Sequence, residues 1–170
     1  MTLDWVPATD RDDLLADPVA RAVREVDGAR VAEIDPELAD TAAFCERYGV
    51  ALDASANCVV VAARRGGEVR YAACMVLATM RVDVNGVVRK HLDARKASFA
   101  PMAQAVELTG MEYGGITPIG LPDDWPILVD AAVADHPDVV IGSGVRRSKL
   151  AVSGAALASL KSADVISLAN

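Results

Sequence analysis

The segment GGITPIG, residues 114–120, could do chemistry with its backbone rather than with its side chains. Three glycines and a proline occupy these seven positions, although ordered glycine loses more conformational entropy than other residues and proline lacks a donor. Such a segment indicates a shape that other residues cannot adopt. With no side chains at Gly114, Gly115 and Gly120, backbone N–H groups can approach a ligand and stabilise a developing negative charge. The alternative is a tight connection between a helix and the next strand.

Cysteine and histidine, which support nucleophilic catalysis and metal binding, are few and scattered. Cys45, Cys58 and Cys74 are odd in number and contain no CxxC pair, which favours free thiols in a reducing compartment. Only His91 and His136 could join them, so we expect no metal site and no cofactor. Cys58 could act as a thiolate nucleophile with a base or cation nearby, or it could be a small buried residue at the head of an apolar strand.

The composition limits the classes of partner. The chain has 170 residues with 24 acidic and 17 basic side chains, and a formal charge of −7, so we expect no binding along duplex DNA. A small pocket could still receive the end of a nucleic acid. The sequence begins MTLDWVPATDRDD, which lacks the basic and apolar parts of a signal peptide. The longest apolar run, Tyr71–Met80, is about half of the ~20 residues in a membrane helix, so we expect a cytoplasmic protein without membrane association.

The spacing of apolar residues alternates between helical and strand patterns, which predicts an α+β (mixed α/β) fold with a central mixed sheet flanked by helices. We expect one domain over residues 1–170, with an N-terminal helical layer in 1–50 and a sheet core carrying the pocket in 51–170. The predicted helices are 11–26, 36–48, 84–92, 101–108, 131–135 and 155–162. The predicted strands are 31–34, 58–63, 69–78, 127–130, 139–142, 149–152 and 165–168. The sequence RRGG between the second and third of these strands predicts a hairpin.

Six motifs follow one another along about residues 40–168: CVVVAA, YAACMVLATMRVDV, LDARKASFAP, ELTGMEYGGITPIG, PILVD and VVIGSGVRRSKL. This order resembles the YbaK/ProX family of prolyl-tRNA editing domains. The most specific part is TG followed by GGITPIG, which is similar to the family's TG...GG(I/V)SP(I/L/F)G segment, with Thr117 where the family usually has serine.

The resemblance implies a YbaK-like mixed sheet, partly closed like a barrel, with a pocket for the aminoacyl group and terminal adenosine of a tRNA. It implies hydrolysis of mischarged aminoacyl-tRNA in trans, with the acceptor end of the tRNA and an aminoacyl-tRNA synthetase as partners. An aminoacyl ester is already activated and the neighbouring ribose hydroxyl can help to place water, so the protein has to supply orientation and oxyanion donors. Pro118 would stiffen the loop and Thr117 would place a hydroxyl at the mouth of the pocket.

The resemblance also implies which residues form the site. The catalytic set is Asn57, Gly115 and Thr117. The substrate-binding set is Cys58, Gly114, Ile116, Pro118, Gly120, Asp130, Gly142, Ser143, Gly144 and Arg146. Asp130 could hold the substrate amino group or cap the next helix. Arg146 could bind a tRNA phosphate, with Arg147 and Lys149 broadening the same basic spot, or it could lie in a solvated turn.

Asn57 stands where the family has its main catalytic or substrate-orienting lysine, because the family's KTLV corresponds to NCVV in ASANCVVV. No lysine or arginine lies between Arg47 and Arg64. An amide keeps the direction of the hydrogen bond but loses about 1–2 kcal/mol of anion stabilisation, which slows a reaction about tenfold or more. Three hypotheses follow: an aminoacyl-tRNA deacylase-like enzyme, a binding module for aminoacyl-tRNA or a synthetase that has lost turnover, or a small-molecule esterase. Asn57 could also be a turn residue ahead of the strand.

Overall fold

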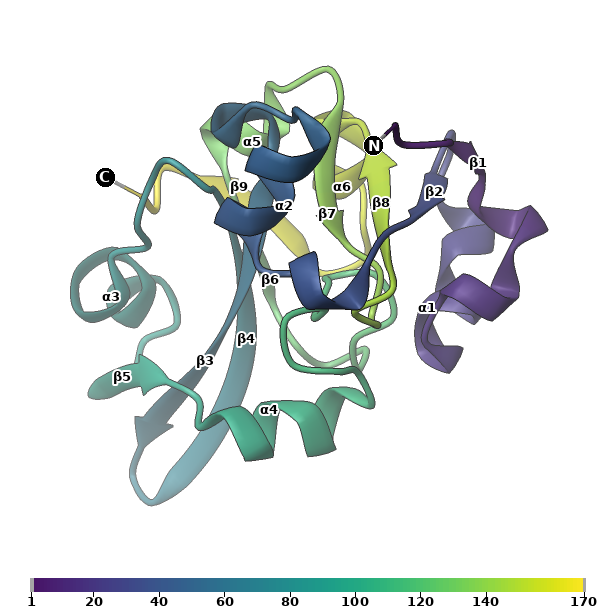
Figure 1. The fold of residues 1–170 in the computed structure, drawn as a ribbon. Coiled ribbons are helices and arrows are strands. Elements are labelled where there is room, and N and C mark those ends of the chain that lie inside the picture. Colours follow the sequence, from purple (N-terminus) through teal and green to yellow (C-terminus); the bar gives the residue numbers. More distant parts are fainter. Residues whose placement is uncertain (1, 170) are drawn as a thin grey trace.

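The computed structural model describes residues 2–169, in which nine strands form two sheets (Figure 1). The four-stranded sheet has the order β1-β2-β8-β7, and the five-stranded sheet has the order β5-β3-β4-β6-β9. The strands are β1 Val6–Pro7, β2 Arg30–Glu33, β3 Ala56–Arg65, β4 Glu68–Leu77, β5 Lys96–Phe99, β6 Ile127–Asp130, β7 Val139–Gly142, β8 Ser148–Val152 and β9 Ala163–Ile166. The α-helices are α1 Asp17–Ala22, α2 Thr41–Tyr48, α3 Arg89–His91, α4 Met102–Thr109, α5 Ala131–Ala134 and α6 Gly154–Ala158. The mixed α and β fold predicted from the sequence is confirmed.

The β3–β4 hairpin dominates the five-stranded sheet, as the sequence predicts. Its strands pair antiparallel from Ala56–Leu77 to Arg65–Glu68. Gly66 and Gly67 form the turn with φ of 59° and 83°, the positive values that a two-residue hairpin turn of the right twist requires. The hairpin therefore holds Asn57 at one end and the arginines of its turn at the other.

The two sheets meet at an isolated parallel bridge between Ser55 and Val140, which lies beside the start of β3. Closure into a barrel is not confirmed, because the described strands separate into two sheets at this point. The N-terminal part is also more than a helical layer. Strands β1 and β2 come from it and pair onto β8, which extends the four-stranded sheet.

Two of the predicted helices are interrupted. The predicted helix 11–26 begins as α1 only at Asp17, because Pro18 lacks an N–H and fits only the first turn. The predicted helix 36–48 divides into a 3₁₀ turn at Pro36–Leu38 and α2, because Asp40 takes the extended conformation of a residue that precedes a helix. Two elements also shift: a π-helical turn, Val84–Val88, precedes α3, and the last strand is two residues earlier than predicted.

One hydrophobic cluster lies between the two sheets and includes Val19 of α1, Val31 of β2, Met75 of β4 and Leu150 of β8. Each of these side chains is at most 1% exposed, so the N-terminal segment and both sheets share the same interior. None of the helices within residues 2–169 is long and apolar enough to cross a membrane.

Candidate functional site

A cavity of about 290 Å³ lies where the two sheets meet, and both sheets contribute to its walls. It is lined by Thr41, Ser55, Ala56, Asn57, Cys58, Val59, Tyr113, Gly114, Ile116, Ile141, Gly142 and Lys149. Five of the positions predicted from the sequence therefore come together: Asn57, Cys58, Gly114, Ile116 and Gly142. Their assignment as catalytic or binding residues remains a prediction.

Asn57 has a fixed orientation in this wall. The hydroxyl of Thr41, the first residue of α2, donates to Asn57 Oδ1 at 2.7 Å. An asparagine amide has one acceptor oxygen and a nitrogen with two donors, so this bond leaves the Nδ2 group as the part available to a ligand. Asn57 is half-buried and therefore presents donors, not a charge, to the cavity.

The first half of the GGITPIG loop packs closely against the end of β7. A Cβ at Gly115 would lie 2.7 Å from the carbonyl oxygen of Val145, and a Cβ at Gly142 would lie 2.6 Å from the carbonyl oxygen of Gly115. The Gly115 N–H donates to the Glu112 carbonyl at 3.0 Å, so it is already engaged. Within residues 2–169, the N–H groups of Gly114 and Ile116, two residues of the cavity wall, have no protein acceptor.

The second half of the loop faces another part of the molecule. Pro118 and Gly120 line a separate cavity of about 160 Å³ beside Ala22 at the end of α1. The predicted position of Thr117 at the mouth of the pocket is wrong, because its side chain is 0% exposed and points inside the fold. In the described part of the chain, the Thr117 hydroxyl has no hydrogen-bond partner.

Of its two predicted roles, Asp130 has the second, as the capping residue of α5. Its side chain is 3% exposed, and its Oδ2 accepts from the N–H of Ala132 in the first turn of α5 at 3.2 Å. Its Oδ1 accepts from the N–H groups of Leu168 and Ala169 at 3.0 and 3.2 Å. The carboxylate is therefore occupied by backbone donors and does not line the cavity.

Ser143 and Gly144 shape the β7–β8 turn next to Gly142 and do not themselves line the cavity. Ser143 Oγ lies 3.1 Å from the carbonyl oxygens of Val145 and Ser148 and is completely buried. Gly144 has a φ of 90° and packs against Ala16. Both residues therefore hold the turn in place.

Arg146 connects three segments at the rim of the cavity. Its guanidinium donates to the carbonyls of Tyr113 and Pro36, each at 3.2 Å, and lies 3.5 Å from Asp40. It also passes over Gly114, where a Cβ would collide with it, and this glycine has a φ of 86°. The guanidinium is therefore already engaged with the protein. Its contact with a tRNA phosphate remains a prediction.

Cys58 is half-buried in the wall that separates this cavity from a neighbouring one. Burial, and then the nearby Cys74, raises the pKa of the Cys58 thiol far above its ordinary value. The sulfur is therefore a protonated thiol at neutral pH, which does not fit a thiolate nucleophile. No three His, Cys, Asp or Glu side chains within residues 2–169 are arranged to hold a metal ion.

Lys149, which the sequence analysis placed only in a basic spot beside Arg146, is instead a buried residue of the cavity wall. It lies on β8, is 7% exposed and is the one charged side chain in the wall described above. Its Nζ donates to the Ala39 carbonyl at 2.7 Å and lies 5.2 Å from the centre of the Phe44 ring. Burial lowers the pKa of Lys149 to about 8. A lysine within the otherwise apolar strand predicted at 149–152 is the signal that could have indicated it.

A second, apolar cavity of about 360 Å³ adjoins the first and shares Cys58, Val59, Tyr113 and Ile116 with it. Its outer wall contains three large apolar side chains that are unusually accessible to solvent. Phe99 is 62% exposed, Tyr113 is 58% exposed and Met102 is 54% exposed. The two cavities together form a polar compartment beside an apolar one.

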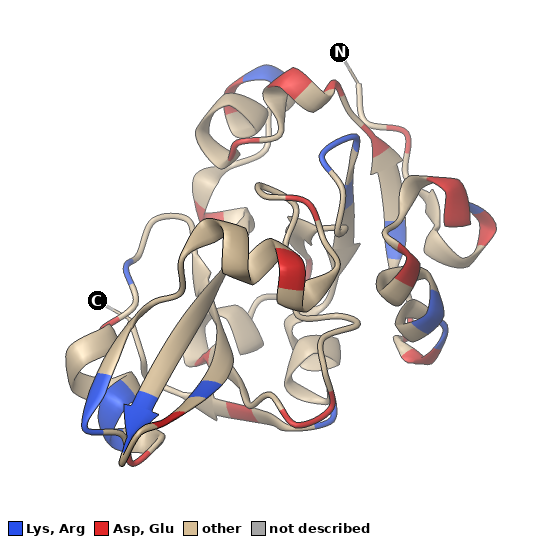
Figure 2. Ribbon diagram, turned by 90° about the horizontal axis from the view of Figure 1, so that it is seen from below, with Lys and Arg blue, Asp and Glu red and all other residues tan. Residues whose placement is uncertain are grey.

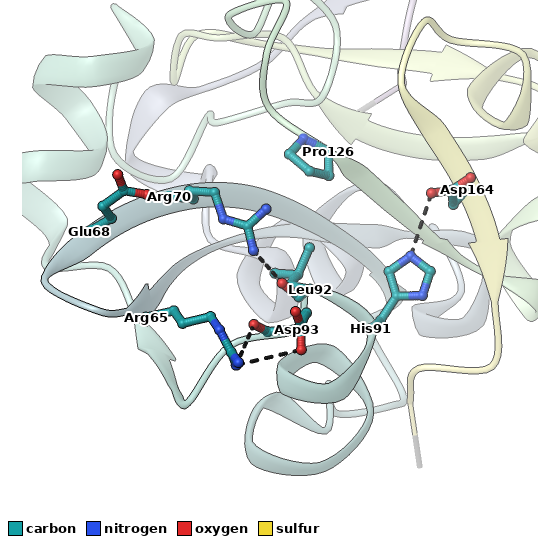
Figure 3. Close-up of a pocket in the computed structure, with 8 residues that line it drawn as sticks. All are labelled: Arg65, Glu68, Arg70, His91, Leu92, Asp93, Pro126 and Asp164. Atoms are coloured by element: carbon teal, nitrogen blue, oxygen red, sulfur yellow. Dashed lines mark hydrogen bonds and ion pairs between the residues drawn. The ribbon is translucent and has the colours of Figure 1, made fainter.

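A larger cavity, of about 590 Å³, lies elsewhere, between the outer part of the hairpin and α3 (Figure 3). Its polar side chains largely contact one another: Arg65 lies 3.5 Å from Asp93 and His91 lies 3.5 Å from Asp164. Arg70 donates to the Leu92 carbonyl. None of the predicted catalytic or substrate-binding residues lines this cavity, so the smaller polar cavity is the better candidate site.

Lysine and arginine gather at the outer end of the hairpin and on the neighbouring β5 and α3 (Figure 2). This basic end consists of Arg64, Arg65, Arg70, Arg89, Lys90, Arg95 and Lys96. Arg64 and Lys96 lie directly opposite each other on paired strands. Like charges in that position destabilise a sheet.

Comparison with known proteins finds a matching family and related sequences. The profile of a family described as "Aminoacyl-tRNA editing domain" matches residues 35–160. The proline-tRNA ligase of Listeria monocytogenes serovar 1/2a is 34% identical over 70 residues, and that of Listeria welshimeri is 33% identical over the same length. Each match covers 41% of this chain and 12% of the ligase, so the similarity concerns a small part of those enzymes.

Solved structures show the same fold over most of the chain. A proposed trans-editing enzyme for prolyl-tRNA synthetase superposes with a TM-score of 0.77 and 20% identity over 91% of this chain and 96% of the other. The hypothetical protein APE2540 superposes with a TM-score of 0.80 and 19% identity over 91% and 100%. The family profile, which matches well over half of the sequence, agrees with this fold. The chain therefore belongs to the aminoacyl-tRNA editing domain family.

Proposed function

We propose that this protein is an aminoacyl-tRNA deacylase, which hydrolyses the ester of a mischarged tRNA at its acceptor end. The observation that carries the proposal is the polar cavity between the sheets. It combines an asparagine amide held by Thr41, the unpaired N–H groups of Gly114 and Ile116, and the closely packed Gly142. The Asn57 amide and the two loop N–H groups are hydrogen-bond donors, as the stabilisation of an oxyanion requires.

The reaction needs little more than these donors. Water attacks the carbonyl carbon of the ester, the carbonyl oxygen becomes an oxyanion, and the bond to the ribose oxygen then breaks. The ribose oxygen takes up a proton, and the products are the free amino acid and a tRNA with a free terminal hydroxyl. Asn57 Nδ2 and the loop N–H groups would hold the carbonyl and ribose oxygens in place, which accounts for catalysis without a side-chain nucleophile.

The apolar compartment provides a place for the terminal adenosine. Tyr113 borders both cavities, and Phe99 lies in the wall of the apolar one. An exposed aromatic ring is a surface on which a base can stack, with a contribution of about 1–3 kcal/mol. We infer that the aminoacyl group enters the polar compartment while the adenine rests against Tyr113.

The basic end of the hairpin suits the phosphates of the acceptor stem. The eight-residue step along β3 from Asn57 to Arg65 corresponds to about 26 Å, so a stem whose end lies in the cavity can reach that region. The rest of this acidic protein offers little attraction for a nucleic acid. The matched proline-tRNA ligases point to tRNA specific for proline, and to prolyl-tRNA synthetase as a partner.

A second function, a binding module without turnover, is favoured by the presence of Asn57 where related proteins are expected to have a lysine. One experiment separates the two functions. The purified protein is incubated with proline-specific tRNA charged with alanine, serine, cysteine or proline, and loss of the ester is followed. We expect at least one mischarged substrate to be hydrolysed at ten times the spontaneous rate or faster, and the correct prolyl-tRNA to be spared. Binding of an acceptor-stem minihelix without hydrolysis would favour the module, and absence of both would contradict both functions.

A further inference from the structure

The residues paired with Lys149 on the neighbouring strands are small and leave space for its side chain. Lys149 is paired with Gly142 on β7 and with Ala32 on β2. Directly opposed residues project from the same face of a sheet, so the lysine lies between a residue with no side chain and one with a single methyl group. A long side chain can therefore cross the face of the sheet to the start of α2, where its Nζ meets the Ala39 carbonyl.

The ammonium group is only partly satisfied there. An ammonium has three N–H donors, and one of them is used by the Ala39 carbonyl. The Phe44 ring supplies a second, weaker contact. Among residues 2–169, no carboxylate lies within ion-pair distance of Lys149, and the nearby Asp40 pairs with Arg146 instead. A buried ammonium without a carboxylate is costly, and an anionic ligand in the cavity would relieve that cost.

The walls of the cavity agree with an anionic or developing anionic ligand. They contain no aspartate or glutamate, and their polar side chains come from Thr41, Ser55, Asn57 and Tyr113 in addition to Lys149. Lys149 and Asn57 approach the same space from different sheets. A carbonyl oxygen held by the Asn57 amide would therefore lie in the cavity that Lys149 also lines.

We propose that Lys149 is a catalytic residue of this site and supplies, from β8, a cation to the cavity in which position 57 carries an uncharged amide. This assignment rests on the proposed function. The Lys149 ammonium donates to the carbonyl oxygen of the aminoacyl ester and stabilises the oxyanion that forms when water adds. It keeps its own proton through the step, while the proton lost by the attacking water ends on the ribose oxygen as the carbon–oxygen bond breaks.

The ionisation of Lys149 supports this role. Burial lowers its pKa to about 8, and of the charged and titratable groups around it Arg146 lowers the pKa further while Cys45 and Asp40 raise it. The group is therefore mostly an ammonium at pH 7 and mostly neutral above pH 9. Deacylation that depends on the ammonium should decline as the pH rises through about 8.

A purely structural role, in which Lys149 only anchors the Ala39 carbonyl, leads to different results. We would compare the wild type with Lys149→Met, Asn57→Lys, the double variant Asn57→Lys/Lys149→Met, and Lys161→Met as a control at an exposed lysine. Each is assayed for deacylation of the best mischarged tRNA at pH 7, and its melting temperature is measured. Replacing a buried charge by an apolar side chain of similar volume is often neutral or stabilising, so Lys149→Met should fold.

We expect Lys149→Met to reduce kcat about 30- to 100-fold with less than a threefold change in KM, because it removes one oxyanion donor. Asn57→Lys should not increase activity, since it places two cations in one cavity. The double variant should recover at least tenfold over Lys149→Met, because the cation then comes from the other wall. Lys161→Met should match the wild type.

The remaining outcomes separate the role of Lys149 from the deacylase function. If the wild type is active and Lys149→Met retains activity within threefold, the role of Lys149 is wrong and the deacylase function stands. If the wild type is inert on every mischarged tRNA, the role of Lys149 and the deacylase function are both wrong. If Lys149→Met does not fold, the wild-type pH profile decides: a fall in kcat above pH 8, after subtraction of spontaneous hydrolysis, supports the role, and a flat profile to pH 9.5 overturns it.

Discussion

Asn57 and Lys149 are anchored to the same three-residue segment although they belong to different sheets. Lys149 Nζ donates to the carbonyl of Ala39, and the hydroxyl of Thr41 donates to Asn57 Oδ1. The interruption of the predicted helix at Asp40 makes this possible, since it ends the 3₁₀ turn before Ala39 and starts α2 at Thr41. The segment 39–41 therefore sets the positions of both polar groups in the cavity.

Loss of the Thr41 hydroxyl should impair catalysis more than folding. In Thr41→Val the Asn57 amide is no longer held with its oxygen turned away from the ligand, so we expect kcat to fall about 5- to 10-fold, the effect of about 1 kcal/mol. The melting temperature should change by only a few degrees, because Thr41 is partly exposed. Thr41→Ser keeps the hydroxyl and should retain most of the activity. Equal loss in both variants would contradict this positioning role.

The stability of the wild type should depend on pH in a way that Lys149→Met removes. The pKa of Lys149 is about 8 in the folded state, below its ordinary value of 10.5, so the folded state binds this proton less tightly than the unfolded state. Below pH 8 the protonated group costs about 3 kcal/mol, and the cost disappears as the pH rises from about 8 towards 10.5. Urea unfolding at pH 7 and pH 10 should show the wild type gaining stability relative to Lys149→Met. A constant difference between the two proteins would show that Lys149 has an ordinary pKa.

Removal of the Tyr113 ring should weaken binding of the substrate without slowing the chemical step. Tyr113→Ala is expected to raise KM about tenfold through lost base stacking, with kcat within threefold of the wild type. The side chain is 58% exposed, so the free energy of unfolding should hardly change. Tyr113→Phe keeps the stacking surface and should resemble the wild type. A fall in kcat with unchanged KM would place Tyr113 in the chemistry instead.

Neutralisation of the basic end should affect only substrates that carry an acceptor stem. We expect Arg64→Gln/Lys96→Gln to raise KM for a mischarged full-length tRNA and to reduce the dependence of KM on salt, because two phosphate contacts are lost. The same variant should hydrolyse a short aminoacylated CCA fragment at the wild-type rate. Its stability should stay equal or increase, since two like charges that face each other are removed. Equal losses on both substrates would contradict the assignment of this surface.

Position 114 should require glycine for two reasons: a side chain would collide with Arg146, and the backbone has a positive φ. Gly114→Ala places a Cβ against the Arg146 guanidinium and also strains a φ of 86°. Gly67→Ala is a matched control, because Gly67 has a φ of 83° and open space around it. We expect the control to lose about 1 kcal/mol of unfolding free energy, and Gly114→Ala to lose more and to reduce deacylation. Equal effects on stability and activity would show that the contact with Arg146 is unimportant.

The parts of the site that could be predicted from the sequence are those set by local pattern. The apolar runs on either side of Gly66 and Gly67 predict the hairpin, and the hairpin places Asn57 at its inner end. The positions of Gly114 and Gly142 beside the cavity agree with the motif order of the family.

The parts that could not be predicted depend on contacts between distant segments. Lys149 reaches the cavity because β7 and β8 form a second sheet that meets the first at Ser55 and Val140, which no local pattern encodes. The pattern of apolar residues in 36–48 continues across Asp40, so it does not reveal the break that frees the Ala39 carbonyl. The burial of Thr117 depends on how the loop turns after Ile116, and residue type alone placed it on the wrong side.

The most direct test of the central claim is the rate at which the wild-type protein, in excess, releases alanine, serine or cysteine from mischarged proline-specific tRNA at pH 7. The cavity, with its fixed Asn57 amide and its buried Lys149 ammonium, predicts hydrolysis of at least one of these esters at ten times the spontaneous rate or faster. Hydrolysis of none of them above the spontaneous rate, by protein that is folded at that pH, would contradict the account.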